Sequence, residues 1–142
     1  MRKLWLMVCL SVLVACAPSA KERGVINVTF TEMIAKITGV DNTFLLMISY
    51  GNDDSCYACK GLKEEIMPVL DEQGIDLYIF DYEDIAEDED LQSQLRVYVN
   101  DTQYSSWPIL LYIKNGSVVS AYEYSLRPEE WKSWLTTYYQ IP

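Results

Sequence analysis

Residues 55–60 read Ser55-Cys56-Tyr57-Ala58-Cys59-Lys60 and follow an apolar run from Thr43 to Tyr50. The run predicts a buried strand, and the residues after it predict a helix because apolar positions recur every three or four residues. These helical positions are Cys59, Leu62, Ile66 and Leu70. Two cysteines separated by two residues at a strand-to-helix junction indicate a redox-active pair.

The place of Cys56 at the predicted helix start bears on its reactivity. Unpaired N–H groups and the positive end of the helix dipole favour a thiolate there, and Lys60 acts in the same direction. Asp53 and Asp54 act against it, because nearby negative charges disfavour another anion. The sequence leaves this balance open. Cys59 lies within reach to resolve a mixed disulfide formed at Cys56.

Length and composition limit the possible functions. The chain has 142 residues, half of them apolar, so we expect one domain with a real core. A formal net charge of −10 argues against nucleic acid as a partner, because phosphate binding needs a basic surface. The chain has no histidine and no second CxxC pair, which excludes the common zinc sites and a histidine-assisted copper site. We expect no metal or other cofactor.

The first residues have the features of a secretion signal. A positive start is followed by an apolar stretch, residues 4–14, that is too short to span a bilayer comfortably. The segment Leu13-Val14-Ala15-Cys16 resembles a bacterial lipoprotein signal, in which the cysteine is lipidated and becomes the mature N-terminus. An ordinary signal peptide with a chance cysteine and an uncleaved membrane anchor are the alternatives.

These features divide the chain into three parts. We expect a signal peptide over residues 1–15, a lipidated N-terminus and flexible tether over residues 16–23, and one folded domain over residues 24–142. The protein is then extracytoplasmic and anchored to a bacterial membrane by lipid on Cys16. Of the four cysteines, only the Cys56–Cys59 pair remains as thiols in the folded domain.

The folded domain alternates between strand and helix signals. Gly74 suits the end of the cysteine helix, and Pro68 inside that helix predicts a kink or a break. Asn115-Gly116 predicts a tight hairpin turn. The expected strands are an edge strand over 24–28, a central strand over 43–50, a strand parallel to it over 75–80, and a hairpin of 109–114 and 117–124. The expected helices begin with the capping box at Thr29, at Cys56, before Leu91 and at Pro128.

Two biased features of the sequence have ordinary explanations. Seven of the ten residues from Asp81 to Asp90 are acidic, which predicts a solvated loop and helix start in preference to a partner-binding site. The 11 tyrosines and four tryptophans fall mostly on helical or strand stripes. Core packing is therefore favoured over an aromatic ligand groove.

The folded domain resembles the thioredoxin family over nearly all of its length. The features that match are the order of elements, the Cys56–Cys59 pair at a strand-to-helix junction, the Trp107-Pro108 step before the hairpin, and the Lys114-Asn115-Gly116 turn. A single CxxC is weak evidence, whereas the four features in order are strong. The acidic, lipid-anchored form looks most like the thioredoxin-like lipoproteins of Gram-positive bacteria, including those called bacteriocin transport accessory proteins.

This resemblance implies an α/β fold in which a central mixed sheet has helices on both faces. It also implies that Cys56 and Cys59 are catalytic and that a cis Pro108 lies against them and presents the backbone of Trp107 to an extended substrate. Tyr57 and Ala58, between the cysteines, are further candidates for substrate binding. A trans proline that simply starts the strand is the alternative for Pro108.

Three departures from the family pattern bear on mechanism. Tyr50 stands six residues before Cys56, where a thioredoxin carries a buried aspartate that assists proton transfer, so an efficient general base is not assured. Ser55 replaces the usual tryptophan, and the helix proline falls about one turn late. Trp107 is also bulky for the residue before the cis-proline, which puts the usual substrate docking in doubt.

Two functions from different classes fit these residues. In the first, the protein is an extracytoplasmic thiol–disulfide oxidoreductase whose partners are protein thiols or disulfides and a redox donor or acceptor protein. In the second, it is a non-catalytic, lipid-anchored accessory or binding module of an export or assembly system, and the pair is a structural disulfide. The direction of exchange and the oligomeric state are left open.

Overall fold

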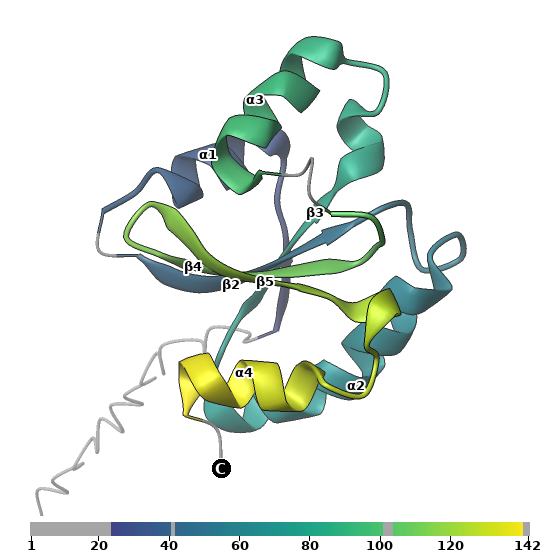
Figure 1. Cartoon of the computed structure of the whole chain (residues 1–142), viewed down its shortest axis with the longest axis vertical. Helices are drawn as coiled ribbons and strands as arrows, with labels where there is room; N and C mark the ends of the chain where they lie inside the picture. Colours follow the sequence, from purple (N-terminus) through teal and green to yellow (C-terminus); the bar gives the residue numbers. More distant parts are fainter. Residues whose placement is uncertain (1–23, 41, 101–103, 141–142) are drawn as a thin grey trace, which may run out of the picture.

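The computed structural model describes residues 24–40, 42–100 and 104–140. The predicted signal peptide, Cys16 and the tether lie outside the described residues. The described part is a five-stranded mixed sheet with two helices on each face, which is the α/β architecture that the sequence predicts (Figure 1). Within it, no helix is both long enough and apolar enough to cross a membrane.

The sheet brings the ends of three strands to one edge. The strands are β1 (Val25–Asn27), β2 (Thr43–Ser49), β3 (Leu77–Asp81), β4 (Ile109–Lys114) and β5 (Ser117–Glu123). They lie in the order β1-β3-β2-β4-β5, with β1 and β2 parallel to β3, and with β4 antiparallel to β2 and β5. Because Ile48 pairs with Ile109, β4 begins at the edge where β2 and β3 end.

The helices form one layer on each face of the sheet. They are α1 (Phe30–Ile37), α2 (Tyr57–Gln73), α3 (Glu89–Val99) and α4 (Trp131–Tyr139), with short 3₁₀ helices η1 (Tyr82–Ile85) and η3 (Tyr124–Leu126). Figure 1 shows α1 and α3 above the sheet and α2 and α4 below it. The capping box is present at Thr29, and the expected edge and central strands are confirmed. The helix expected at Pro128 instead begins at Trp131, after a turn.

The chemistry of single residues explains where α2 ends and where the hairpin turns. Gly74 ends α2 with φ +68°, and Asn115 and Gly116 both have positive φ, as a tight hairpin turn requires. The break that the sequence allows at Pro68 does not occur, because α2 is continuous from Tyr57 to Gln73. Pro68 is exposed, so the carbonyl that loses its partner can bond to water.

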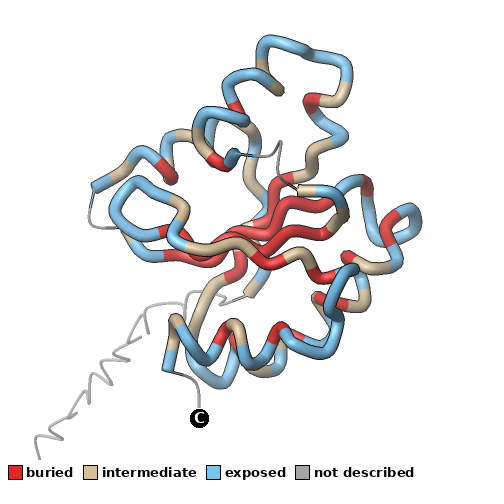
Figure 2. The backbone as a smooth tube through the Cα atoms, in the orientation of Figure 1, coloured by how far each residue is buried: buried red, intermediate tan, exposed pale blue. Residues whose placement is uncertain are grey.

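Each helix layer encloses its own hydrophobic core, and the buried residues lie along the sheet and the inner helix faces (Figure 2). The core under α1 and α3 includes Met33, Ile37, Phe80, Leu95 and Ile109. The core under α2 and α4 includes Cys56, Cys59, Leu62, Leu110 and Tyr122. Trp131 Nε1 donates a hydrogen bond of 2.8 Å to a carboxylate oxygen of Glu65, which fastens α4 to α2.

Candidate redox site at the start of α2

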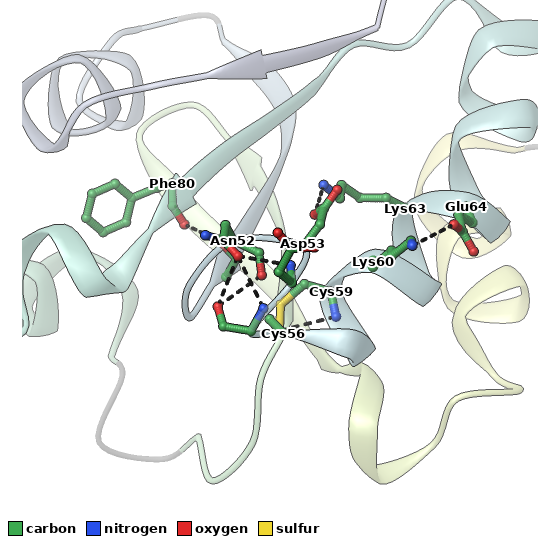
Figure 3. Close-up of polar contacts among 11 residues, drawn as sticks. Asn52, Asp53, Cys56, Cys59, Lys60, Lys63, Glu64 and Phe80 are labelled. Carbon is green, nitrogen blue, oxygen red and sulfur yellow. Dashed lines mark hydrogen bonds and ion pairs between the residues drawn. A yellow bond between two sulfur atoms is a disulfide. The ribbon is translucent and has the colours of Figure 1, made fainter.

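Cys56 and Cys59 form a disulfide at the N-terminal end of α2, with their Cα atoms 5.2 Å apart (Figure 3). Cys56 is the N-cap residue, and its Sγ accepts a hydrogen bond of 3.2 Å from the backbone N–H of Cys59. Cys56 is 9% exposed and Cys59 is 1% exposed. Cys56 is therefore the residue of the pair that an incoming protein reaches more easily.

The loop between β2 and α2 is held by Asn52 and Asp81. The side-chain Oδ1 of Asn52 accepts the N–H of Asp54 at 2.9 Å, and its backbone oxygen accepts the N–H of Cys56 at 2.8 Å. Asp81, at the end of β3, accepts the N–H of Gly51 at 2.8 Å. These bonds tie the cysteine loop to both strands and fix where α2 begins.

Gly51 is required by the shape of this loop. Its φ of +85° is a conformation that other L-residues rarely adopt. A Cβ at this position would also lie 2.2 Å from the Oγ of Ser55, the residue before Cys56. Gly51 therefore allows the end of β2 to pack directly against the residue that precedes the redox pair.

A cleft of about 500 Å³ reaches Cys59 from the side of β1 and β3. Its lining is partly polar and includes Ser49, Asp53, Lys63 and Asp81. The carboxylate of Asp53 and the Nζ of Lys63 form an ion pair there, and Figure 3 shows both side chains on the same side of the disulfide. A cleft of this size and polarity has room for several water molecules next to the buried cysteine.

The Trp107-Pro108 peptide bond is cis, as the resemblance implies. Pro108 lies next to the start of β4, and its backbone oxygen accepts the N–H of Tyr124 at 3.1 Å. Tyr124 in turn lies beside α2, where its hydroxyl would be 3.9 Å from a Cβ at Gly61. Burial there, helped by a hydrogen bond to Glu65, raises the pKa of Tyr124. Tyr124 thus links the cis-proline segment to the cysteine helix.

Trp107 packs on two tyrosines, and we call these three side chains the aromatic platform. The ring centroid of Trp107 lies 5.0 Å from that of Tyr82 and 6.0 Å from that of Tyr50, and the two tyrosine rings are 6.0 Å apart. Tyr50 is 43% exposed, and the other two are half-buried. Most aromatic residues in the described part of the chain pack in or against the two cores, as the sequence predicts. The aromatic platform differs because part of it is exposed to solvent.

The loop before the cis-proline is anchored by Glu123 at the end of β5. One carboxylate oxygen accepts the backbone N–H groups of Ser105 and Ser106 at 2.7 and 3.0 Å, and both serine hydroxyls contact it as well. Partial burial alone would raise the pKa of Glu123, but these four hydrogen bonds outweigh it and lower the pKa.

The structure brings the two cysteines together, and it also brings Tyr50, Tyr82 and Trp107 together at the same edge of the sheet. Tyr57 is 81% exposed beside the disulfide, whereas Ala58 is half-buried and packs on the core. The role of these residues and of Pro108 in substrate binding stays a prediction. Neither the Asp53–Lys63 pair nor the Glu123 anchor was predicted from the sequence.

The fold was compared with known proteins. Neither a family model nor a curated protein matches the sequence, but solved structures match the fold. Thioredoxin O1 from Arabidopsis thaliana in its oxidised state aligns with a TM-score of 0.50 at 14% identity, covering 78% of this chain and 97% of that chain. A Schistosoma mansoni thioredoxin aligns with a TM-score of 0.47 at 16% identity, covering 70% and 82%. The first likeness, with the sheet order and helix layers, shows a thioredoxin-like fold.

Proposed function

We propose that this protein is a thiol–disulfide oxidoreductase that acts on protein disulfides through Cys56 and Cys59. The observation that carries the proposal is the joined pair at the start of α2, where the Sγ of Cys56 accepts an N–H and Cys56 is the more exposed of the two residues. A thiolate at this place is stabilised by the helix N-terminus, and it is the form of cysteine that attacks disulfides.

The exchange has two steps in the reducing direction. The Cys56 thiolate attacks a substrate disulfide, a bond forms between Cys56 Sγ and one substrate sulfur, and the other substrate sulfur leaves as a thiolate. Cys59 then loses its proton and attacks Cys56 Sγ, so that the Cys56–Cys59 disulfide forms and the first substrate sulfur is released. Two electrons pass to the substrate, and a dithiol protein returns the pair to the reduced state. The reverse sequence oxidises a substrate.

The second step needs a proton acceptor, because Cys59 can attack only as a thiolate and is only 1% exposed to water. The carboxylate of Asp53 lines the cleft that reaches Cys59, and water in the cleft can carry the proton between them. Asp81 is engaged by the N–H groups of Gly51 and Glu83. Asp53 pairs with Lys63 but keeps half of its side chain exposed, and it is the proposed acceptor in place of the aspartate that the resemblance to thioredoxins would expect at Tyr50.

Insulin reduction by dithiothreitol tests the proposal. The wild-type protein should accelerate the reaction, Cys56→Ser should abolish the acceleration, and Cys59→Ser should accumulate a mixed disulfide that mass spectrometry detects. Circular dichroism of each variant controls for folding, with Cys59→Ala as a second variant because serine adds a buried hydroxyl. A wild-type protein without activity, or variants as active as the wild type, would favour the non-catalytic accessory module.

The proposal includes an extracytoplasmic place, supported by the residues of the predicted signal and by Cys16. Mass spectrometry of the membrane fraction of an expressing bacterium should find Cys16 as an acylated N-terminus. Two or more acyl chains anchor a protein stably, whereas one binds only marginally, so Cys16→Ala should release most of the protein. An unmodified Cys16, or a Cys16→Ala protein that stays in the membrane fraction, would remove the anchoring part and leave the redox part standing.

A further inference from the structure

The aromatic platform of Tyr50, Tyr82 and Trp107 is joined to the redox loop by direct contacts. Tyr50 precedes Gly51, whose backbone packs against the side chain of Ser55 immediately before Cys56. An extended chain advances about 3.3 Å per residue. A polypeptide whose cysteine reacts at Cys56 can therefore reach the platform with a residue a few positions away.

Carboxylates lie beside Tyr50 and Tyr82, on the side of the redox loop. Asp81 bonds to the N–H of Gly51, and Glu83 Oε2 would lie 3.5 Å from a Cβ at Gly51. Asp54 lies in the loop itself and is exposed. The segment from residue 81 to 90 adds further acids and holds no lysine or arginine.

The nearby cations on α2 do not neutralise this surface, because each already faces a carboxylate. Lys63 pairs with Asp53, and Lys60 lies 4.0 Å from Glu64. The field over the platform is consequently negative, and it attracts a positively charged group. Partly exposed aromatic rings beside carboxylates match an arginine, whose planar cation stacks on rings and bonds to carboxylates.

We propose that the aromatic platform and its acidic surround select protein disulfides that carry an arginine within a few residues of the reacting cysteine. The proposal rests on the proposed function and names the class of substrate for the same site. The arginine contributes to docking before exchange, and the bonds that form and break are those already described. It gives the half-exposed tyrosines a role beyond packing.

The test compares peptide disulfides that are identical except for one residue, arginine or glutamate, two positions from the cysteine. The wild-type protein should reduce the arginine peptide about fivefold faster in kcat/KM, a ratio typical of one cation–π contact. The ratio should fall as salt rises from 0.05 to about 0.5 M, because salt screens exposed charges.

Two variants examine the two parts of the surface separately. Tyr82→Leu removes an aromatic face and Glu83→Gln removes an acid, and each should lower the arginine-to-glutamate ratio toward one. Glu72→Gln, an exposed acid near the far end of α2, is the matched control and should leave the ratio unchanged. Circular dichroism identifies any variant that does not fold, and the other variant then decides.

The outcomes separate this inference from the proposed function. Equal rates for the two peptides in the wild type, or an unchanged ratio in both variants, would overturn the inference while leaving the oxidoreductase standing. Failure to reduce either peptide or insulin would overturn both. A ratio that falls only in Glu72→Gln would locate the selectivity elsewhere and also count against the platform.

Discussion

The two faces of the sheet bury different chemistry. Under α1 and α3, the core of the described residues consists of aliphatic and aromatic side chains and one methionine. Under α2 and α4, the core includes both cysteines of the disulfide, packed with Leu62, Leu110 and Tyr122. The redox bond is thus part of a hydrophobic core, so the packing of that layer and the oxidation state of the pair depend on each other.

This difference predicts that stability and redox behaviour are coupled on one face only. Reduction of the pair adds two electrons and breaks one covalent bond inside the α2–α4 layer. The free energy of unfolding should therefore differ between the oxidised and reduced protein. Mutations in that layer should change this difference, whereas mutations in the other layer should lower both stabilities together.

Leu62→Ala and Leu95→Ala form the matched pair that should give the largest effects. Both leucines are helical and fully buried, Leu62 in the α2–α4 layer and Leu95 in the α1–α3 layer. Each substitution should lower the free energy of unfolding by about 3 kcal/mol, from lost burial and the cavity that remains. Urea unfolding of the oxidised and reduced protein measures both values.

The difference in the free energy of unfolding between the oxidised and the reduced protein distinguishes the two layers. Leu62→Ala should change it by about 1 kcal/mol, because Leu62 lies one turn after Cys59 and shares its core. Leu95→Ala should leave it within error of the wild type. If the two variants changed the difference equally, the comparison between the faces would be wrong.

Asp53→Asn should have a smaller effect, confined to kinetics. Loss of the proposed proton acceptor should slow attack by Cys59 about tenfold, at the low end of what general bases contribute. Stability should change by less than about 1 kcal/mol, because the Asp53–Lys63 pair is partly exposed. Stopped-flow measurement of the decay of the mixed disulfide reports the step directly.

Asp71→Asn, at an exposed position near the end of α2, is the control for Asp53→Asn and should leave the decay unchanged. At neutral pH the mixed disulfide should decay more slowly in Asp53→Asn than in the wild type. At high pH the two rates should converge, because hydroxide can then take the proton from Cys59. Equal decay in Asp53→Asn and wild type would show that the cleft carboxylate does not take the proton.

Much of this fold could be predicted from the sequence because its signals are local. An apolar run identifies β2 as a central strand, the capping box starts α1, and Asn115-Gly116 sets the hairpin. The thioredoxin-like architecture was implied by a family resemblance, which rested on the order of such signals together with the cysteine pair, the Trp107-Pro108 step and the hairpin turn. A local rule was outweighed at Pro68, where an exposed helix face tolerates the proline and the helix does not break.

The features of the site that were missed depend on contacts between distant segments. Asp53 and Lys63 come from the loop and from α2, and the platform joins residues 50, 82 and 107. No spacing pattern in the sequence identifies such contacts. The signal available was Tyr50, at the position where the resemblance expects an aspartate, which left an efficient general base unassured.

Glu123→Gln should give the smallest effect, and its pH dependence has a definite sign. Glu123 ties the segment before Trp107, which packs on the α1–α3 layer, to the strand that leads to Tyr124 in the α2–α4 layer. Because the four hydrogen bonds favour the carboxylate, the pKa of Glu123 is lower in the folded protein than in the unfolded chain. The carboxylate therefore stabilises the fold above the unfolded pKa of about 4.3, and this contribution is lost as pH falls through the lower folded pKa.

At pH 7, Glu123→Gln should lower the free energy of unfolding by about 1 kcal/mol, since hydrogen bonds to a charged acceptor are replaced by bonds to a neutral one. Urea unfolding between pH 7 and about pH 3 should show the wild type losing this advantage below its unfolded pKa, until the two proteins converge. Glu129→Gln, an exposed acid before α4, is the control and should follow the wild type throughout. The difference in the free energy of unfolding between the oxidised and reduced protein, which Leu62→Ala should change, should stay unchanged in Glu123→Gln, because Glu123 lies outside both cores. A stability loss that does not depend on pH would mean that Glu123 acts through packing and not through its charge.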